Sequence, residues 1–186
     1  MYKKNLILLL LLVSSLAGLA QKKVFSKTGI ISFYSETTIE KIQAVNKKAL
    51  VVIDAENNKI EFSVLIKGFE FEKALMQEHF NDTYLESDKY PKATFKGSFT
   101  ETSLPLVFTD NTTKTMMVNG NLTIHGVTKP ITASATISVK NKVIHATSNF
   151  KVTLSDYNIK IPALVAGNIS KVVDVKIDIP SLEEMK

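Results

Sequence analysis

The sequence has 186 residues, with 23 basic and 18 acidic side chains and a formal net charge of +5. Every basic residue is Lys, and the lysines are scattered along the chain. Because phosphate recognition favours the bidentate Arg side chain, we expect no nucleic-acid partner. The absence of Cys excludes disulfides and a lipid anchor attached through cysteine.

The first 20 residues have the three parts of a secretory signal peptide. Two lysines precede an apolar run from Leu6 to about Leu12, and small residues follow up to Ala20. The apolar run is shorter than the roughly 18 to 20 residues that span a bilayer, so we predict cleavage after Ala20 and no transmembrane span in the mature chain. Residues 21–186 then form one periplasmic or secreted domain.

Eight segments of the mature chain have the composition or the apolar–polar alternation of β-strands. One apolar and one polar face per strand is typical of an antiparallel sheet with one side in water. A sheet of this size splits into a sandwich or closes into a barrel, and an eight-stranded barrel can enclose one small ligand. The predicted strands lie at residues 29–35, 48–55, 60–66, 93–100, 115–124, 131–139, 144–154 and 173–179, and residues 55–58, 126–130 and 140–141 are turn-like.

Two further segments have apolar residues at helical spacing. The segment Ser35–Lys48 has Ile39, Ile42 and Val45 at this spacing and is predicted to form a short connecting helical turn. The second segment predicts a helix that packs on the sheet and caps one end of a barrel; its aromatic-rich stripe consists of Phe69, Phe71, Leu75, Met76, Phe80 and Tyr84. Tyr90-Pro91 stops this helix, because the residue before proline leaves helical backbone space.

Two stretches of the chain resemble the YceI-like family of secreted polyisoprenoid- and lipid-binding domains. The stretch Leu75–Gly97 contains His79-Phe80, an aromatic–acidic run and Tyr90-Pro91 before a strand, and the stretch Val118–Ile137 begins VNGNLTIHGVTKP. The resemblance covers nearly all of the mature chain. It implies an all-β fold with one or two short helices, an eight-stranded antiparallel lipocalin-like barrel. It also implies that an apolar interior holds a long isoprenoid or fatty-acyl chain, for transport, storage or stress protection.

We expect the inward-facing apolar side chains of this barrel and its helix to line the ligand pocket. Burial stabilises an alkyl chain by about 0.8 kcal/mol per methylene group, so such a ligand needs few polar contacts. We expect a polar end of the ligand to meet His79, Tyr84 or Tyr90. The predicted ligand-binding residues are Phe33, Phe62, Val64, Phe69, Phe71, Leu75, His79, Phe80, Tyr84, Tyr90, Phe95, Ile124, Phe150 and Val152.

Two alternative functions remain beside the binding protein that we favour. A secreted hydrolase or isomerase would use His79 with Glu86 or Asp88 as acid and base. We favour the simpler interpretation that these carboxylates cap and solvate the turn before Tyr90. The other alternative is a solid barrel that acts through a protein partner. A homodimer is compatible with each of these functions.

We expect no cofactor and no metal site. The three histidines are His79, His125 and His145, and a zinc site would need several of them to converge with carboxylate help. His145 alternates out of phase with the apolar residues of its strand, and His125 is out of phase with Leu122 and Ile124. We therefore predict that His125 and His145 lie on the surface or at strand ends.

Overall fold

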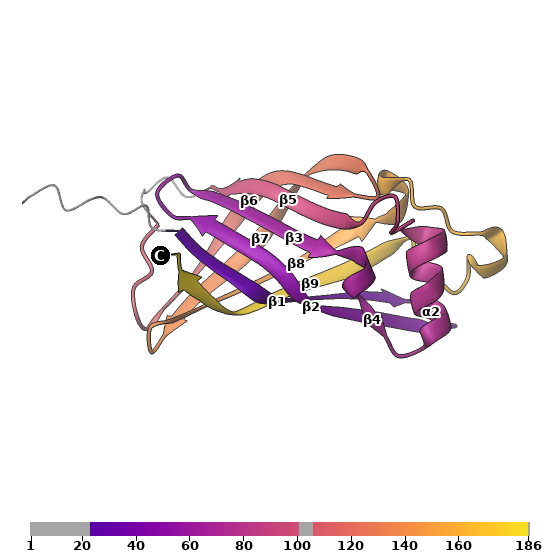
Figure 1. Ribbon diagram of the computed structural model, residues 1–186, viewed down its shortest axis with the longest axis horizontal. Coiled ribbons are helices and arrows are strands. Elements are labelled where there is room, and N and C mark those ends of the chain that lie inside the picture. Colours follow the sequence, from indigo (N-terminus) through magenta and orange to yellow (C-terminus); the bar gives the residue numbers. More distant parts are fainter. Residues whose placement is uncertain (1–22, 101–105, 186) are drawn as a thin grey trace, which may run out of the picture.

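The computed structural model describes residues 23–100 and 106–185 of the chain. Within these ranges, eight antiparallel strands follow the sheet order β1-β9-β8-β7-β6-β5-β3-β2, and the pairing of β1 with β2 closes the sheet into a barrel (Figure 1). The prediction of an eight-stranded antiparallel barrel is confirmed, and the sandwich is not formed. The strands are β1 (Lys23–Glu36), β2 (Lys41–Asp54), β3 (Lys59–Leu65), β5 (Lys92–Phe99), β6 (Thr112–Ile124), β7 (Val127–Lys140), β8 (Val143–Thr153) and β9 (Val172–Glu184).

Alternation along each strand explains why these residues form a barrel with an apolar interior. In β7, Ala135, Ile137 and Val139 are buried, whereas Ser134 and Lys140 are exposed. Successive side chains of a strand point to opposite faces, so one apolar face per strand turns inward when the sheet closes. The predicted signal peptide, residues 1–20, lies outside the described residues.

The helical turn predicted for Ser35–Lys48 is wrong: most of this segment belongs to β2. The register passes from Gly29↔Ala49 to Ile31↔Asn46, which places one extra residue of β2 opposite β1 and makes a β-bulge. Ala44 and Asn46 are buried before the bulge and Ala49 after it. The bulge follows Ile39, Ile42 and Val45 in the sequence, so the helical spacing of these residues has another origin. Ile39 lies in the β1–β2 turn, whereas Ile42 and Val45 point to opposite faces of β2.

The segment between β3 and β5 forms a lid at one end of the barrel (Figure 1). We use the word lid for residues 66–85, which contain η1 (Ile66–Gly68), β4 (Glu70–Phe71), α2 (Ala74–His79) and the π-helical turn η2 (Phe80–Tyr84). The predicted capping helix is confirmed, but it begins later than the apolar stripe. The reason is that Phe71 and Glu70 pair with Ala44 and Val45 of β2 and are therefore extended.

The other end of the barrel is closed by tightly packed side chains. Val24, Ile53, Phe99, Leu106 and Leu182 belong to one buried cluster at that end. A buried hydrogen bond also joins the β2–β3 turn to the end of β5, from the Asn58 amide to the Phe99 carbonyl oxygen (2.6 Å). This packing leaves the lid end as the route into the interior.

The turn predicted for residues 126–130 is shorter than expected. Ile124 pairs with Val127, so the turn consists of His125 and Gly126, which both have positive φ angles (51° and 73°). Two residues with positive φ form the tight hairpin that matches the twist of antiparallel strands. Residues 127–130 belong to β7.

In the described part of the chain, we find no helix with the length and apolar character that crossing a bilayer requires.

Candidate functional site

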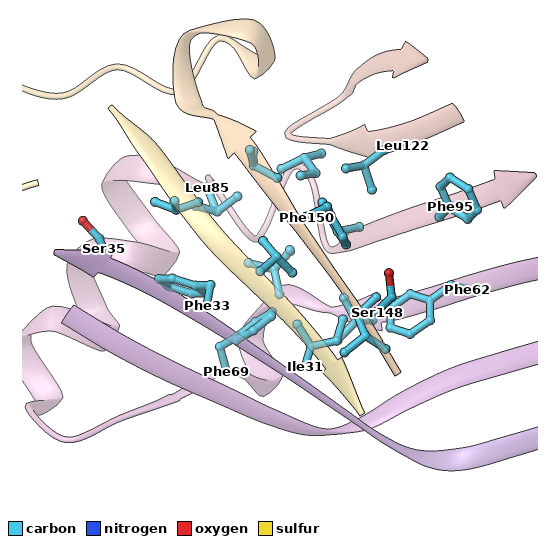
Figure 2. Close-up of a pocket in the computed structure, with 18 of the residues that line it drawn as sticks. Ile31, Phe33, Ser35, Phe62, Phe69, Leu85, Phe95, Leu122, Ser148 and Phe150 are labelled. Atoms are coloured by element: carbon cyan, nitrogen blue, oxygen red, sulfur yellow. The ribbon is translucent and has the colours of Figure 1, made fainter. Parts of the chain in front are cut away.

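The barrel encloses an apolar cavity of about 560 Å³. All eight barrel strands contribute to its wall, together with the lid and the connection between β8 and β9. Figure 2 shows lining side chains that include Phe69 and Leu85 of the lid, Phe33 of β1 beside it, and Phe62 and Ser148 further from it. The volume is within the range of about 300–1,000 Å³ that is typical of small-molecule sites. The barrel is therefore hollow, and a solid core does not describe it.

Four phenylalanines form a cluster where the lid meets the barrel. Phe33 of β1 packs against Phe69, Phe71 and Phe80 of the lid, with ring centroids 5.4 to 5.8 Å apart, and Phe71 lies 5.0 Å from Phe80. All four rings line the cavity. Aromatic pairs at these distances add about 0.5–1.5 kcal/mol beyond their buried area. The cluster therefore holds the lid in place and forms the apolar wall of the cavity at the lid end.

The ionisable side chains of the cavity wall all lie at the lid end. They are Glu40 of the β1–β2 turn and Lys73, His79 and Tyr84 of the lid. Burial raises the pKa of Tyr84, so its phenol is neutral at neutral pH. The deeper wall has only apolar side chains and a few hydroxyl groups, such as that of Ser148, which donates to the Ser134 carbonyl oxygen (2.8 Å). A charged group of a ligand is therefore favoured only near the lid.

Glu40 joins three segments at the lid end. Its Oε1 accepts a hydrogen bond from Lys73 Nζ (2.9 Å), and its Oε2 accepts one from Asn168 Nδ2 (3.2 Å). These bonds, that of Lys73 first, hold the pKa of Glu40 below its ordinary value. Thr37 positions the carboxylate, because its hydroxyl accepts the Glu40 backbone N–H (3.0 Å) in the tight turn. We call Glu40, Lys73 and Asn168 the latch.

Thirteen of the fourteen predicted ligand-binding residues line the cavity. Tyr90 lies outside the wall: its ring packs edge-on against His125, with centroids 4.7 Å apart. It follows the lid in sequence but turns toward the β6–β7 hairpin. The residues that line the cavity are Phe33, Phe62, Val64, Phe69, Phe71, Leu75, His79, Phe80, Tyr84, Phe95, Ile124, Phe150 and Val152.

Sequence reasoning missed two groups of lining residues. The first consists of inward-facing apolar residues such as Ile131, Ala133 and Val175, and their alternation with polar neighbours was a signal that could have found them. The second is the latch. No local pattern predicts it, because Glu40 is 33 residues from Lys73 and 128 from Asn168 in the sequence.

The carboxylates of the enzymatic alternative contact side chains other than His79. Glu86 Oε2 lies 2.7 Å from Nε2 of His125, and Asp88 Oδ1 lies 2.6 Å from Lys67 Nζ. His125 also lies 3.1 Å, through Nδ1, from the Tyr157 carbonyl oxygen, so its ring joins the segment after the lid to η3 (Leu154–Tyr157). Both carboxylates thus stabilise the turn that follows the lid.

The other predicted surface histidine, His145, is half-exposed on β8, 2.7 Å from Asp178 Oδ1 of β9. His125 sits at a strand end, as predicted. Across residues 23–100 and 106–185, no group of three or more His, Asp or Glu side chains is placed to hold a metal ion.

The sequence matches the family model of the YceI-like domain over residues 23–180. That range includes the lid and every barrel strand except the last four residues of β9. The chain belongs to the YceI-like domain family. A comparison with curated proteins finds no match.

Several solved structures of other proteins have the same fold as this YceI-like barrel. A polyisoprenoid-binding domain from Saccharophagus degradans, implicated in plant cell wall breakdown, matches with a TM-score of 0.74 and 15% identity, over 89% of this chain and 99% of that one. BcnA of Burkholderia cenocepacia matches with a TM-score of 0.67 and 16% identity, over 81% and 94%. The YceI protein of Campylobacter jejuni matches with a TM-score of 0.56 and 20% identity, over 77% and 84%.

The YceI-like barrel brings the two recognised sequence stretches together. Strand β5 of the first stretch pairs with β6 of the second, with Gly97 opposite Gly120. The Tyr90 ring lies on Gly126, where an added Cβ would be 2.5 Å from the ring. Gly126 also has a positive φ of 73°, which other residues rarely adopt. Both the contact with the Tyr90 ring and the backbone conformation therefore favour glycine at this position. The two stretches thus form one structural unit, which includes most of α2 and all of η2 of the lid.

Proposed function

We propose that this YceI-like barrel is a binding protein that holds one long apolar chain, an isoprenoid or fatty-acyl lipid, in its interior. The observation that supports this most is the enclosed cavity of about 560 Å³ with an apolar wall. One water molecule occupies about 30 Å³ of liquid and a methylene group is of similar size, so the cavity has room for roughly 20 such groups. The structural neighbour from Saccharophagus degradans, described as polyisoprenoid-binding, supports the same ligand class.

The thirteen lining residues of the original prediction are our proposed contacts for the chain. Ten buried methylene groups contribute about 8 kcal/mol, which corresponds to roughly micromolar affinity before the cost of immobilising the ligand. Because the ionisable lining groups lie at the lid end, the ligand enters with its apolar tail first. Its polar end then lies near His79, Tyr84 and the latch.

The test is native mass spectrometry of the purified mature protein, followed by solvent extraction and identification of the released lipid. We expect a stoichiometric added mass that extracts as an isoprenoid or fatty-acyl chain. A clean apo mass, together with no uptake of added isoprenoid or fatty acid, would reject the proposal. It would favour a barrel that acts through a protein partner.

We also propose that the protein works in the periplasm or outside the cell, in carriage, storage or stress protection of its ligand. This rests on the signal-peptide pattern of residues 1–20. The intact mass of the exported protein should correspond to a chain that begins at Gln21. Full-length protein that stays in the cytoplasmic fraction would contradict this location.

The enzymatic alternative has less support, because Glu86 and Asp88 pair with His125 and Lys67. We infer a binding role without turnover. An enzyme that uses His79 would lose its activity on the extracted lipid in His79→Ala while still binding it. We expect instead that the extracted lipid is chemically unchanged after incubation with the wild-type protein and with the His79→Ala variant.

A further inference from the structure

Exposed apolar side chains gather around the mouth of the cavity. Ile39 is 68% exposed in the β1–β2 turn, Leu75 is 61% exposed in α2, and Leu164 is 96% exposed in η4 (Ala163–Val165). The latch shows that these segments are neighbours, since Glu40 bonds to both Lys73 and Asn168. Gly167 also lies next to Ile39, whose Cδ1 would be 3.2 Å from an added Cβ.

The β8–β9 connection contributes a long, basic and mostly apolar loop to this mouth. Residues 158–171 contain seven hydrophobic residues, two lysines (Lys160 and Lys171) and no carboxylate side chain. The loop forms the right-hand tip of the molecule in Figure 1, beyond α2. Loops longer than about 12–15 residues without regular structure are usually functional or disordered. Here η4 and the latch order the loop, which favours a functional role.

Lys160 and Lys171 outnumber Asp156 of η3, the exposed carboxylate two residues before the loop. Lys41 pairs with Glu36 (2.7 Å), and Lys73 pairs with Glu40. Glu78 of α2 and Glu72, which precedes this helix, line a polar groove together with Lys67 and Asp82. Leu75 and Met76 of α2 line the cavity instead. The exposed tip is therefore apolar and positive, while the acidic face of α2 points elsewhere.

We propose that this mouth rim, defined as Ile39, Leu75 and the loop 158–171, docks on the surface of an anionic lipid bilayer. The inference rests on the proposed function, because it explains how a chain that is insoluble in water reaches the cavity. Apolar side chains with nearby lysines favour insertion into an anionic membrane interface. The rim surrounds an opening, so a protein seated on it would block the cavity. A bilayer instead makes the cavity continuous with an apolar phase.

Rim residues that do not line the cavity allow docking and binding to be separated. Ile39 and Leu164 are exposed and lie outside the cavity wall, so Ile39→Ser with Leu164→Ser leaves the cavity unchanged. The matched control is Leu50→Ser with Val143→Ser, two exposed apolar residues on the side of the barrel and at its closed end. Lys160→Glu with Lys171→Glu tests the charge.

The experiment measures transfer of a fluorescent fatty acid from the loaded protein to vesicles of phosphatidylcholine with or without phosphatidylglycerol. We expect the rate to rise with vesicle concentration, and to be faster with phosphatidylglycerol unless salt is high. The rim variant should transfer roughly tenfold more slowly and the control should match the wild type. The lysine variant should lose about fivefold or more in rate with anionic vesicles only.

A rate that is independent of vesicle concentration, or equal rates for rim variant and wild type, would overturn the proposal. A dimer that the rim variant converts to monomer in analytical ultracentrifugation would also overturn it and assign the rim to a second copy of the chain. Failure of the proposed function is recognised separately, because the protein alone, measured without vesicles, would then not bind the fatty acid. In that case cosedimentation of the unloaded protein with phosphatidylglycerol vesicles still tests docking, and equal cosedimentation of rim variant and wild type would refute it.

Discussion

Filling the cavity from one wall should weaken ligand binding by a predictable amount. Ala133 faces the cavity from β7, and Ala133→Phe adds six ring carbon atoms at that point. If the ring displaces two to four methylene groups of the chain, each worth about 0.8 kcal/mol, binding weakens by about 1.6–3.2 kcal/mol. That range corresponds to a roughly 15- to 200-fold higher Kd. The cavity would then retain a shorter chain.

The assay is displacement of a fluorescent fatty acid, combined with native mass spectrometry of the lipid that copurifies with each variant. The matched control is Ser134→Phe, which places the same ring on the outer face of the same strand. It should leave the Kd unchanged. Thermal unfolding of both variants shows whether the fold is intact. A folded Ala133→Phe protein with wild-type Kd and wild-type chain length would refute the assignment of the cavity as the ligand site.

Three further predictions concern the lid and the sheet beneath it. Phe80→Ala removes one ring of the phenylalanine cluster and should destabilise the protein by about 2–3 kcal/mol in denaturant titrations. This is below the range for fully buried rings, because Phe80 is only half-buried. An unchanged denaturation midpoint would contradict the role of the cluster in holding the lid. The pKa of Glu40 is lowered from the ordinary Glu value of 4.5, so its ionised form stabilises the folded latch at any pH above 4.5. This stabilisation is lost as the pH falls through the lower pKa of the folded state. Ligand release should therefore accelerate in acid, and Glu40→Gln, which keeps the size but weakens the bond to Lys73, should release ligand quickly already at pH 7 with little further acid effect. Gly120→Ala would place a Cβ 2.5 Å from the Phe95 ring and from a backbone oxygen. Overpacking of this kind costs about 1–3 kcal/mol and should lower the Tm by roughly 3–10 °C, whereas a wild-type Tm would contradict the close packing at this position.

The positions of the lining side chains were largely predictable, because they follow from alternation. Phe62, Val64, Phe150 and Val152 each occupy the apolar phase of a strand, and each lines the cavity. Tyr90 was different. It follows the lid and precedes a proline, so the sequence placed it near the pocket, but its ring packs on His125 of the β6–β7 turn. No periodicity describes a residue in an irregular segment.

The error at Ser35–Lys48 has a similar physical cause. A β-bulge changes the inward-facing phase in the middle of β2, and the buried Asn46 stabilises it there. The Asn46 amide donates to the Leu65 carbonyl oxygen (2.9 Å), and its Oδ1 accepts the Lys48 backbone N–H (2.8 Å). A polar residue at an inward position breaks the apolar pattern, and its partner Leu65 at the end of β3 is visible only in the folded sheet.

The sequence by itself determined most of the strand segments and which face of each is apolar, because side chains alternate along an extended backbone whatever its partners are. It also determined the helix at one end, through its aromatic stripe. Only the tertiary structure decided that the first strand β1 pairs with the last strand β9 in a closed barrel, that the interior keeps about 560 Å³ open, and that Glu40, Lys73 and Asn168 meet at its mouth. Closure, cavity volume and the latch all depend on contacts between residues far apart in the chain, and such contacts leave no local pattern in a single sequence.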